Sequence, residues 1–131
     1  HIRKYDDAIA IWHRYVQVTN GSAQAYNDLA LTFQAAHRLG EADAAFRTGI
    51  SKEPMNKQCQ MNYGIMLARQ GKFDDAAAHM EKVCSAAEVN YELGALCEEQ
   101  GRKDQAKTYY EKSIELDPKA SAPQARLAAL R

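Results

Sequence analysis

The sequence repeats itself at a spacing of 34 residues, and this period constrains the fold more than any other feature. One column is always alanine, with spacings of 34, 34 and 30 residues: Ala8, Ala42, Ala76 and Ala106. A column of large residues keeps the same spacings: Trp12, Phe46, Met80 and Tyr110. Each member of a third column is followed by a small residue: Leu29-Ala30, Tyr63-Gly64, Leu93-Gly94 and Leu127-Ala128. The agreement between columns, including a shared deletion, indicates stacked structural repeats.

Each repeat contains two amphipathic helical segments. Residues 26–36 place apolar side chains at the i, i+3, i+4 and i+7 positions of one buried helix face: Tyr26, Leu29, Ala30 and Phe33. Residues 41–51 do the same with Ala42, Ala45, Phe46 and Ile50. A short polar turn lies between the segments, and in later repeats it contains Gly71 or Gly101, which suits the left-handed end of a helix. The pattern predicts an all-α fold of antiparallel helical hairpins.

These columns resemble the tetratricopeptide repeat family. The middle repeat matches the family pattern of large, small, glycine, aromatic and alanine positions at Tyr63, Gly64, Leu67, Gly71, Phe73, Ala76 and Met80. The resemblance covers essentially the whole chain. It implies a right-handed superhelix, an α-solenoid, of antiparallel helix-turn-helix hairpins. It does not specify a function, since many unrelated systems use one scaffold.

Five positions depart from the family pattern. His37 stands in a turn where glycine is usual, and Gly49 and Ser113 stand where alanine is usual. Gln60 and Asn90 occupy a position that is often aromatic. We expect these residues to loosen the packing locally.

We expect a single repeat array over residues 1–131. Its predicted parts are a second helix of a truncated upstream repeat (1–22), three repeats (23–56, 57–86 and 87–120) and a C-terminal capping or partial-repeat helix (121–131). Residues 5–18 match a second helix alone. The native protein is therefore expected to continue upstream of residue 1.

The 57–86 repeat is predicted to be shortened. The four-residue deletion lies between Val83 and Leu93 and corresponds to about one helical turn. We place the loss at the end of the second helix of this repeat. Ser85 with Glu88, and Ser121 with Gln124, match the capping box that marks a helix start.

Charge and motif content argue against several classes of function. Lys+Arg and Asp+Glu both number 17, whereas nucleic-acid binders usually carry a basic excess. The histidines lack the H-E-x-x-H spacing, and no glycine-rich phosphate loop appears. We therefore expect no enzyme activity, no cofactor, no metal and no nucleic-acid partner. No apolar run approaches the ~18 residues that span a bilayer, so membrane insertion is not expected.

The cysteines bear on the compartment. Cys59, Cys84 and Cys97 are odd in number and form no C-x-x-C pair, so we expect small buried hydrophobic residues and no disulfide. This favours a reducing, cytoplasmic location. The periplasm stays open, because the native N-terminus is expected to lie upstream.

The resemblance implies that ligands meet the first helices, on the face turned away from the second helices. Carried over by position, the partner-binding residues of this concave groove are Asn27, Leu31, Met61, Asn62, Ile65, Arg69, Tyr91, Glu92 and Glu99. Among the groove residues, Leu31, Met61, Ile65 and Tyr91 form an apolar strip, and Glu88, Glu92, Glu98 and Glu99 form an acidic end. The expected partner is a protein or peptide, amphipathic with some basic character. Two alternatives stay open: the strip packs between hairpins or on a neighbouring chain, and the acids form a solvated face.

One specialised ligand is excluded. Some relatives grip a C-terminal carboxylate with lysine, arginine and asparagine, at positions that correspond here to Asn27, Leu31, Asn62, Glu88 and Glu92. Only Asn62 fits, and the two glutamates would repel a carboxylate. A carboxylate-clamp ligand is therefore not expected.

Two functions follow from this reading. The chain binds a peptide or helical segment of a partner in its groove, or it is a self-assembly element, a homo-oligomer or part of a larger complex. Bacterial secretion or pilus assembly is an example of the second setting.

Overall fold

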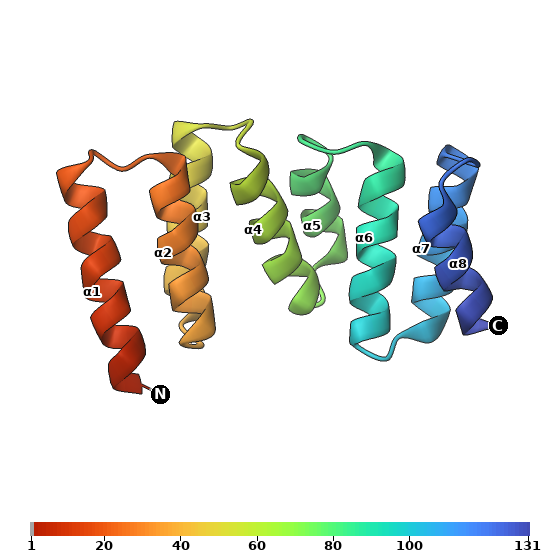
Figure 1. Ribbon diagram of the computed structural model, residues 1–131, viewed down its shortest axis with the longest axis horizontal. Helices are drawn as coiled ribbons and strands as arrows, with labels where there is room; N and C mark the ends of the chain where they lie inside the picture. Colours follow the sequence, from red (N-terminus) through yellow and green to blue (C-terminus); the bar gives the residue numbers. More distant parts are fainter. Residues whose placement is uncertain (1) are drawn as a thin grey trace. The chain divides into compact units, whose positions relative to one another are not determined.

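The structure, a computed structural model, describes residues 2–131, with side chains from residue 4 onwards. Every regular element in this range is an α-helix, which confirms the all-α prediction (Figure 1). The helices are α1 (Ile2–Val18), α2 (Ala23–Ala35), α3 (Leu39–Lys52), α4 (Lys57–Arg69), α5 (Phe73–Met80), α6 (Ala86–Glu99), α7 (Lys103–Leu116) and α8 (Ser121–Leu130).

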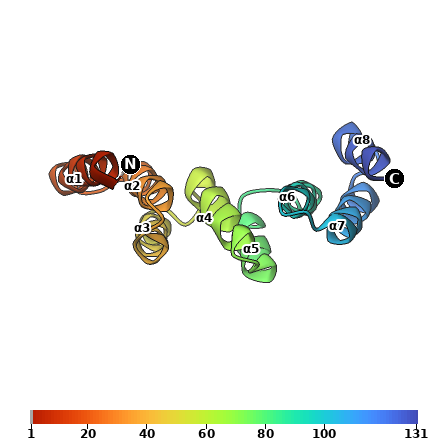
Figure 2. The same ribbon diagram turned by 90° about the horizontal axis from the view of Figure 1, so that it is seen from below.

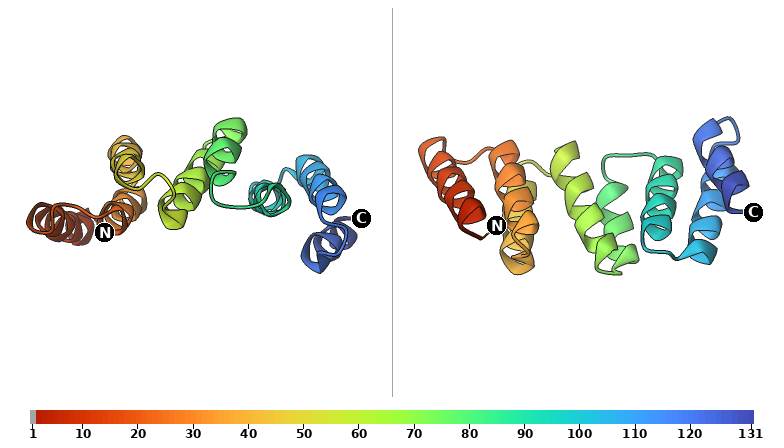
Figure 3. Two further views of the ribbon diagram at one scale, coloured as in Figure 1. Left: turned by 90° about the horizontal axis from the view of Figure 1, so that it is seen from above. Right: turned by 60° about the horizontal axis from the view of Figure 1, so that its bottom comes forward.

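The chain divides into two compact units, and the division falls inside α4. The N-terminal unit is His1–Tyr63 and the C-terminal unit is Gly64–Arg131. In the N-terminal unit, α2 and α3 form an antiparallel hairpin, and α1 lies along α2 (Figure 2). In the C-terminal unit, α6 and α7 form the corresponding hairpin, α8 packs on α7, and α5 contacts α6 (Figure 3).

The repeat columns form the core of each unit. In the N-terminal unit, Leu29 and Phe33 on α2 are each 3% exposed, and Phe46 on α3 is fully buried. In the C-terminal unit, Cys97 and Tyr110 are fully buried in one apolar cluster with Ala106 and Leu127. The hydrophobic effect on these faces, rather than helix propensity alone, stabilises the hairpins.

Small residues allow the paired helices to approach closely. A Cβ atom on Gly64 would lie 2.8 Å from Cγ of Met80, and a Cβ atom on Gly94 would lie 2.6 Å from Cε1 of Tyr110. Both distances are shorter than real side chains tolerate. At Gly64 and Gly94, the small residue is thus required by the large residue that the second helix places against it.

Three helix-ending turns share one conformation. Gly71 and Gly101 have φ of 82° and 75°, and His37 has φ of 61° at the equivalent place. In each turn a backbone amide donates to a carbonyl five residues earlier; the first of these bonds joins Arg38 N to Phe33 O at 2.9 Å. This is the Schellman pattern, which favours glycine. His37 therefore adopts a left-handed conformation that costs a side-chain-bearing residue about 1–2 kcal/mol.

In the repeat over residues 57–86, the second helix is shortened and the linker that follows it is not. α5 has 8 residues, whereas α3 and α7 have 14 each. The chain then turns through residues 81–84 to Ser85, whose hydroxyl accepts from Glu88 N at 3.2 Å. The Glu88 carboxylate accepts in return from Ser85 N at 3.4 Å, so the capping box predicted here is confirmed.

The capping box predicted at Ser121 is wrong. The N-cap of α8 is Ala120, and Ser121 is already the first helical residue. The side-chain amide of Gln124 donates instead to the carbonyl of Pro118 at 2.7 Å. The carbonyl of Pro118 lies near the first turn of α8 and accepts from the side-chain amide of Gln124. In a capping box, this side chain would instead pair with the backbone N–H of the N-cap residue.

The expected loosening at Gly49 and Ser113 is also wrong. A Cβ atom on Gly49 would lie 3.0 Å from Sγ of Cys59, so the space is already filled. The Ser113 hydroxyl donates to the carbonyl of Ala87 at 2.7 Å. Cys59 fills the space beside Gly49, and the carbonyl of Ala87 accepts from the hydroxyl of Ser113.

Candidate functional site

In the N-terminal unit, an asparagine pair underlies the predicted binding face. The side-chain amide of Asn62 donates to Oδ1 of Asn27 at 3.0 Å and so joins α4 to α2. Asn27 is only 2% exposed, whereas Asn62 is half-buried. The Asn27 side chain is therefore occupied inside the structure, and a ligand could reach Asn62 more readily.

Apolar residues of the predicted strip stay accessible to different degrees. Leu31 on α2 is 39% exposed. Met61 and Ile65 on α4 are half-buried, and Arg69 is exposed. Because these three are spaced four apart, they lie on one face of α4. This face combines apolar contact area with a cation at its C-terminal end.

Arg69 is paired within the C-terminal unit. Its Nε and Nη2 donate to the two carboxylate oxygens of Glu99 at 3.1 and 3.2 Å, which links α4 to α6. About half of each side chain is exposed, so solvent screens the pair. Arg69 and Glu99 thus lie close together on the surface and largely neutralise each other.

The carboxylate of Glu98 also has partners within the C-terminal unit. It accepts from the Tyr110 hydroxyl at 2.6 Å and from Arg126 of α8 at 3.3 Å. Burial and this bond to Glu98 raise the pKa of Tyr110 above its ordinary value, so the hydroxyl stays protonated. A hydrogen bond to Tyr91 is the main cause that raises the pKa of the Arg126 guanidinium. The Tyr91 ring also packs on Tyr110 at 5.8 Å between centroids, so Tyr91 contributes to the core as well as to the surface.

A hollow of about 410 Å³ lies on α6 and α8 in the C-terminal unit. Its lining residues are Glu92, Ala95, Leu96, Glu98, Glu99 and Arg126. Among the described side chains, Glu92 forms no salt bridge, whereas Glu98 and Glu99 each have an arginine partner. The acidic end predicted from the sequence is thus milder than its four glutamates suggest, since Glu88 caps α6 and two others are paired.

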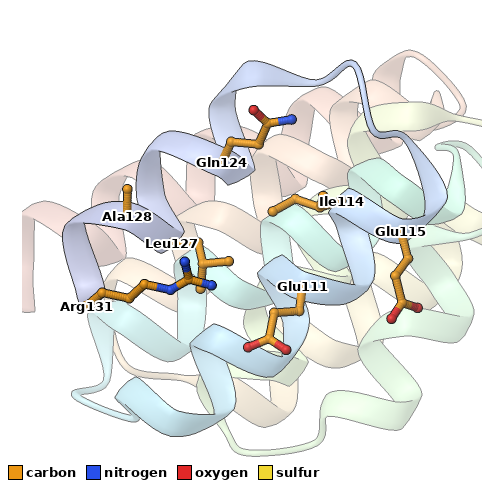
Figure 4. A pocket seen from close by; sticks show the side chains of 7 residues that line it. All are labelled: Glu111, Ile114, Glu115, Gln124, Leu127, Ala128 and Arg131. Carbon is orange, nitrogen blue, oxygen red and sulfur yellow. The ribbon is translucent and has the colours of Figure 1, made fainter.

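Further hollows, two of them of similar volume, were not predicted. One, of about 400 Å³, lies between α1 and α2 and is lined by Ile11, Trp12, Tyr15, Ser22, Gln24, Ala25 and Asp28. The other, of about 410 Å³, lies on α7 and α8 (Figure 4). A signal for the first was present in the sequence, because Ile11, Tyr15 and Val18 have helical spacing and would share a face.

The described residues include no candidate metal-binding group and two buried thiols. No group of three or more His, Cys, Asp or Glu side chains in this range could hold a metal ion. Cys59 and Cys97 are buried as predicted, but Cys84 is only half-buried. Burial raises the pKa of the Cys59 thiol to about 11, so it is protonated and unreactive near neutral pH. Within the same range, no helix has both the length and the apolar character needed to cross a membrane.

Known proteins with similar sequences share the repeat. Two family models, both described as tetratricopeptide repeat, match residues 27–90 and 87–120. A curated relative, the type IV pilus assembly protein PilF of Pseudomonas aeruginosa, is 26% identical over 108 residues, which cover 78% of this chain and 43% of that protein. The chain therefore spans less than half the length of this relative.

Solved structures show the same fold. The structure of P. aeruginosa PilF matches with a TM-score of 0.69 at 23% identity, over 97% of this chain and 60% of that one. MamA matches with a TM-score of 0.65 at 23% identity, over 88% and 70%. YrrB, described as a TPR protein with an unusual peptide-binding site, matches with a TM-score of 0.65 at 14% identity, over 95% and 66%.

These likenesses support an all-α helical-repeat fold and a role as a protein-interaction scaffold. Tetratricopeptide repeat proteins bind protein partners and are typically non-catalytic.

Proposed function

The chain belongs to the tetratricopeptide repeat family, and from this we propose that it binds a peptide or helical segment of a partner protein along the first helices of its hairpins. The partner segment is amphipathic and carries basic side chains. The protein contributes recognition and no catalytic step.

The hollow on α6 and α8 is the observation that carries this proposal. Ala95 and Leu96 supply an apolar lining, while three carboxylates and one guanidinium surround it. Since Glu98 and Glu99 already have arginine partners, Glu92 is the carboxylate that can accept a new cation. A lysine or arginine beside an apolar side chain matches this arrangement.

We assign roles to the other predicted residues from their exposure to solvent. In the N-terminal unit, exposed Leu31 and half-buried Met61 offer apolar contact, and Asn62 offers a polar group. Ile65 and Arg69 extend the accessible face of α4. Asn27 acts indirectly, because its carbonyl oxygen holds the amide of Asn62.

Amide chemical-shift mapping tests the proposal. The probes are a Lys-rich amphipathic helical peptide and a matched peptide in which every Lys is replaced by Glu. The basic peptide is expected to shift amides of α6 near Glu92 and of α8 near Arg126, and the acidic peptide is not. Equal shifts with both peptides, or shifts confined to α3, α5 and α7, would contradict the assignment.

A second candidate, a role in type IV pilus assembly, is favoured by the 26% identity to PilF of P. aeruginosa. Deleting residues 1–131 from the native gene and counting type IV pili by electron microscopy tests it. Loss of pili that the intact gene restores supports this candidate, and an unchanged pilus count contradicts it.

A further inference from the structure

A hollow of about 280 Å³ lies in the N-terminal unit, over α2 and between α1 and α3. Three rings line it: His13 from α1, and Tyr26 and Phe33 from α2. The rings of His13 and Phe33 are 5.7 Å apart between centroids. Tyr26 and Phe33 are on the side of α2 opposite to Leu31, so this hollow is separate from the first-helix face to which the peptide is proposed to bind.

The wall on α3 is made of small side chains, among them Ala44 and Ala45. The column just before the large residues contains Ala45, His79 and Tyr109, so Tyr109 on α7 is the counterpart of Ala45 in the C-terminal unit. Tyr109 is half-buried, and its ring packs on Phe73 of α5 at 6.1 Å between centroids. A tyrosine ring of the C-terminal unit thus occupies the place that Ala45 leaves open in the N-terminal unit.

Phe33 does not close the hollow, although it is larger than its counterpart Cys97. Its ring lies under Arg38, whose guanidinium carbon is 5.1 Å from the ring centroid. Arg38 is held in turn by Glu41 at 2.6 Å and by Asp6 of α1 at 3.3 Å. The cation at this end of the hollow is therefore neutralised by two carboxylates.

The Tyr26 end of the hollow carries a cation without a carboxylate. Nζ of Lys52 lies 5.8 Å from the centroid of the Tyr26 ring and donates to the carbonyl of Asn20 at 3.3 Å. None of the ion pairs among the described side chains includes Lys52. Lys52 is exposed, so a carboxylate beside Tyr26 could pair with it.

Going beyond the proposed function, we propose that this hollow receives one tyrosine side chain of a partner protein, with the carboxylate of the next partner residue on Lys52. A space of about 280 Å³ accommodates a single aromatic side chain and no helix. Rings in its walls favour an aromatic guest, since aromatic pairs gain from edge-to-face and offset packing. The partner thereby supplies the ring that Tyr109 supplies within the C-terminal unit, and it is anchored on the second-helix side of α2.

Three blocked peptides test the chemistry of the guest: acetyl-Ala-Tyr-Asp-Ala-amide, the same peptide with Leu for Tyr, and the same peptide with Asn for Asp. Amide chemical-shift titration of the whole chain gives the site and the dissociation constant of each. The Tyr-Asp peptide is expected to shift amides of α1 near His13 and of α3 near Ala45. The Leu peptide should bind about fivefold more weakly, and the Asn peptide about threefold more weakly.

Filling the hollow from inside tests its position. Ala45→Tyr introduces the ring that the C-terminal unit has at Tyr109 and is expected to abolish binding of the Tyr-Asp peptide. Ala44→Tyr, at an exposed residue of the wall, should abolish it as well and decides the matter if circular dichroism shows Ala45→Tyr to be unfolded. Ala78→Tyr is the matched control, because Ala78 is the exposed counterpart of Ala44 on α5 and should leave binding unchanged.

Charge reversal tests the role of Lys52. Lys52→Glu should weaken the Tyr-Asp peptide by about threefold or more, whereas Lys103→Glu, at an exposed residue of α7, should not. Glu92→Lys should also leave this binding unchanged, which separates the inference from the proposed recognition at α6 and α8. Equal affinities for the Tyr and Leu peptides, or equal affinities of the Ala44→Tyr and Ala78→Tyr proteins, would overturn the inference.

Discussion

Tyr110 occupies the space that a side chain on Gly94 would need, since a Cβ atom there would lie 2.6 Å from Cε1 of the Tyr110 ring. Tyr110 is fully buried, and its hydroxyl is fixed by Glu98, so the ring has little freedom to move. The spacing between α6 and α7 therefore depends on the absence of a side chain at Gly94.

We expect Gly94→Ala to lower the free energy of unfolding by about 1–3 kcal/mol, because it overpacks a full core. Urea denaturation measures the change. Gly40→Ala is the matched control: Gly40 lies in α3, and a Cβ atom there would meet nothing within 4 Å. The control should raise the stability by roughly 0.5–1 kcal/mol, since alanine is the better helix former. Equal effects at the two positions would show that the close approach is unimportant.

His37→Gly should stabilise the protein by up to about 1 kcal/mol, because relief of the left-handed conformation outweighs the greater freedom of glycine in the unfolded chain. The reverse change, Gly101→Ala, should destabilise by about 1–2 kcal/mol through φ alone, as no atom lies within 4 Å of the added Cβ. Thermal unfolding monitored by circular dichroism measures both. A destabilising His37→Gly would mean that the imidazole makes a compensating contact.

Ser85→Ala should cost about 1 kcal/mol, because it removes the hydroxyl that caps α6. Ser121→Ala should be neutral within roughly 0.5 kcal/mol, since Ser121 is exposed and caps nothing. Both serines stand three residues before Glu or Gln in the sequence, so the pair separates a formed capping box from an apparent one. Similar losses in the two variants would refute this distinction.

Tyr63 should make the free energy of unfolding depend on pH in the alkaline range. Burial, together with the hydrogen bond that its hydroxyl donates to Asp43, raises the pKa of Tyr63 from 10.0 to about 12. The folded protein favours the protonated phenol, so this contribution is complete below pH 10 and is lost as pH rises towards about 12. Relative to Tyr63→Phe, the wild type should lose stability across this window in urea denaturation. Parallel curves for the two proteins would contradict the assignment.

The repeat columns predicted the hairpins because helical periodicity and close packing both act on positions that recur along the chain. Ser85 and Glu88 were identified as a cap for the same local reason. Ser121 was not predicted correctly, because the placement of α8 depends on which carbonyl the preceding Pro118 turn presents to Gln124, and a four-residue pattern does not contain that information.

The binding face was harder to predict. Its residues were selected by position in a helix, but their charges depend on partners far away in the sequence. Glu99 pairs with Arg69 and Glu98 pairs with Arg126, across 30 and 28 residues. Helical periodicity does not predict either pair, so the acidity predicted for this surface from the sequence was too high.

The claim that the hollow on α6 and α8 recognises a basic segment is tested most directly by the affinity of one Lys-rich amphipathic peptide for two charge-reversal variants, measured by fluorescence anisotropy. Glu92→Lys alters the carboxylate that lines the hollow, and Glu81→Lys makes the same change at an exposed residue just after α5. We predict that Glu92→Lys weakens binding by about 1 kcal/mol, roughly fivefold in Kd, while Glu81→Lys binds like the wild type. Equal dissociation constants for the two variants would contradict the account.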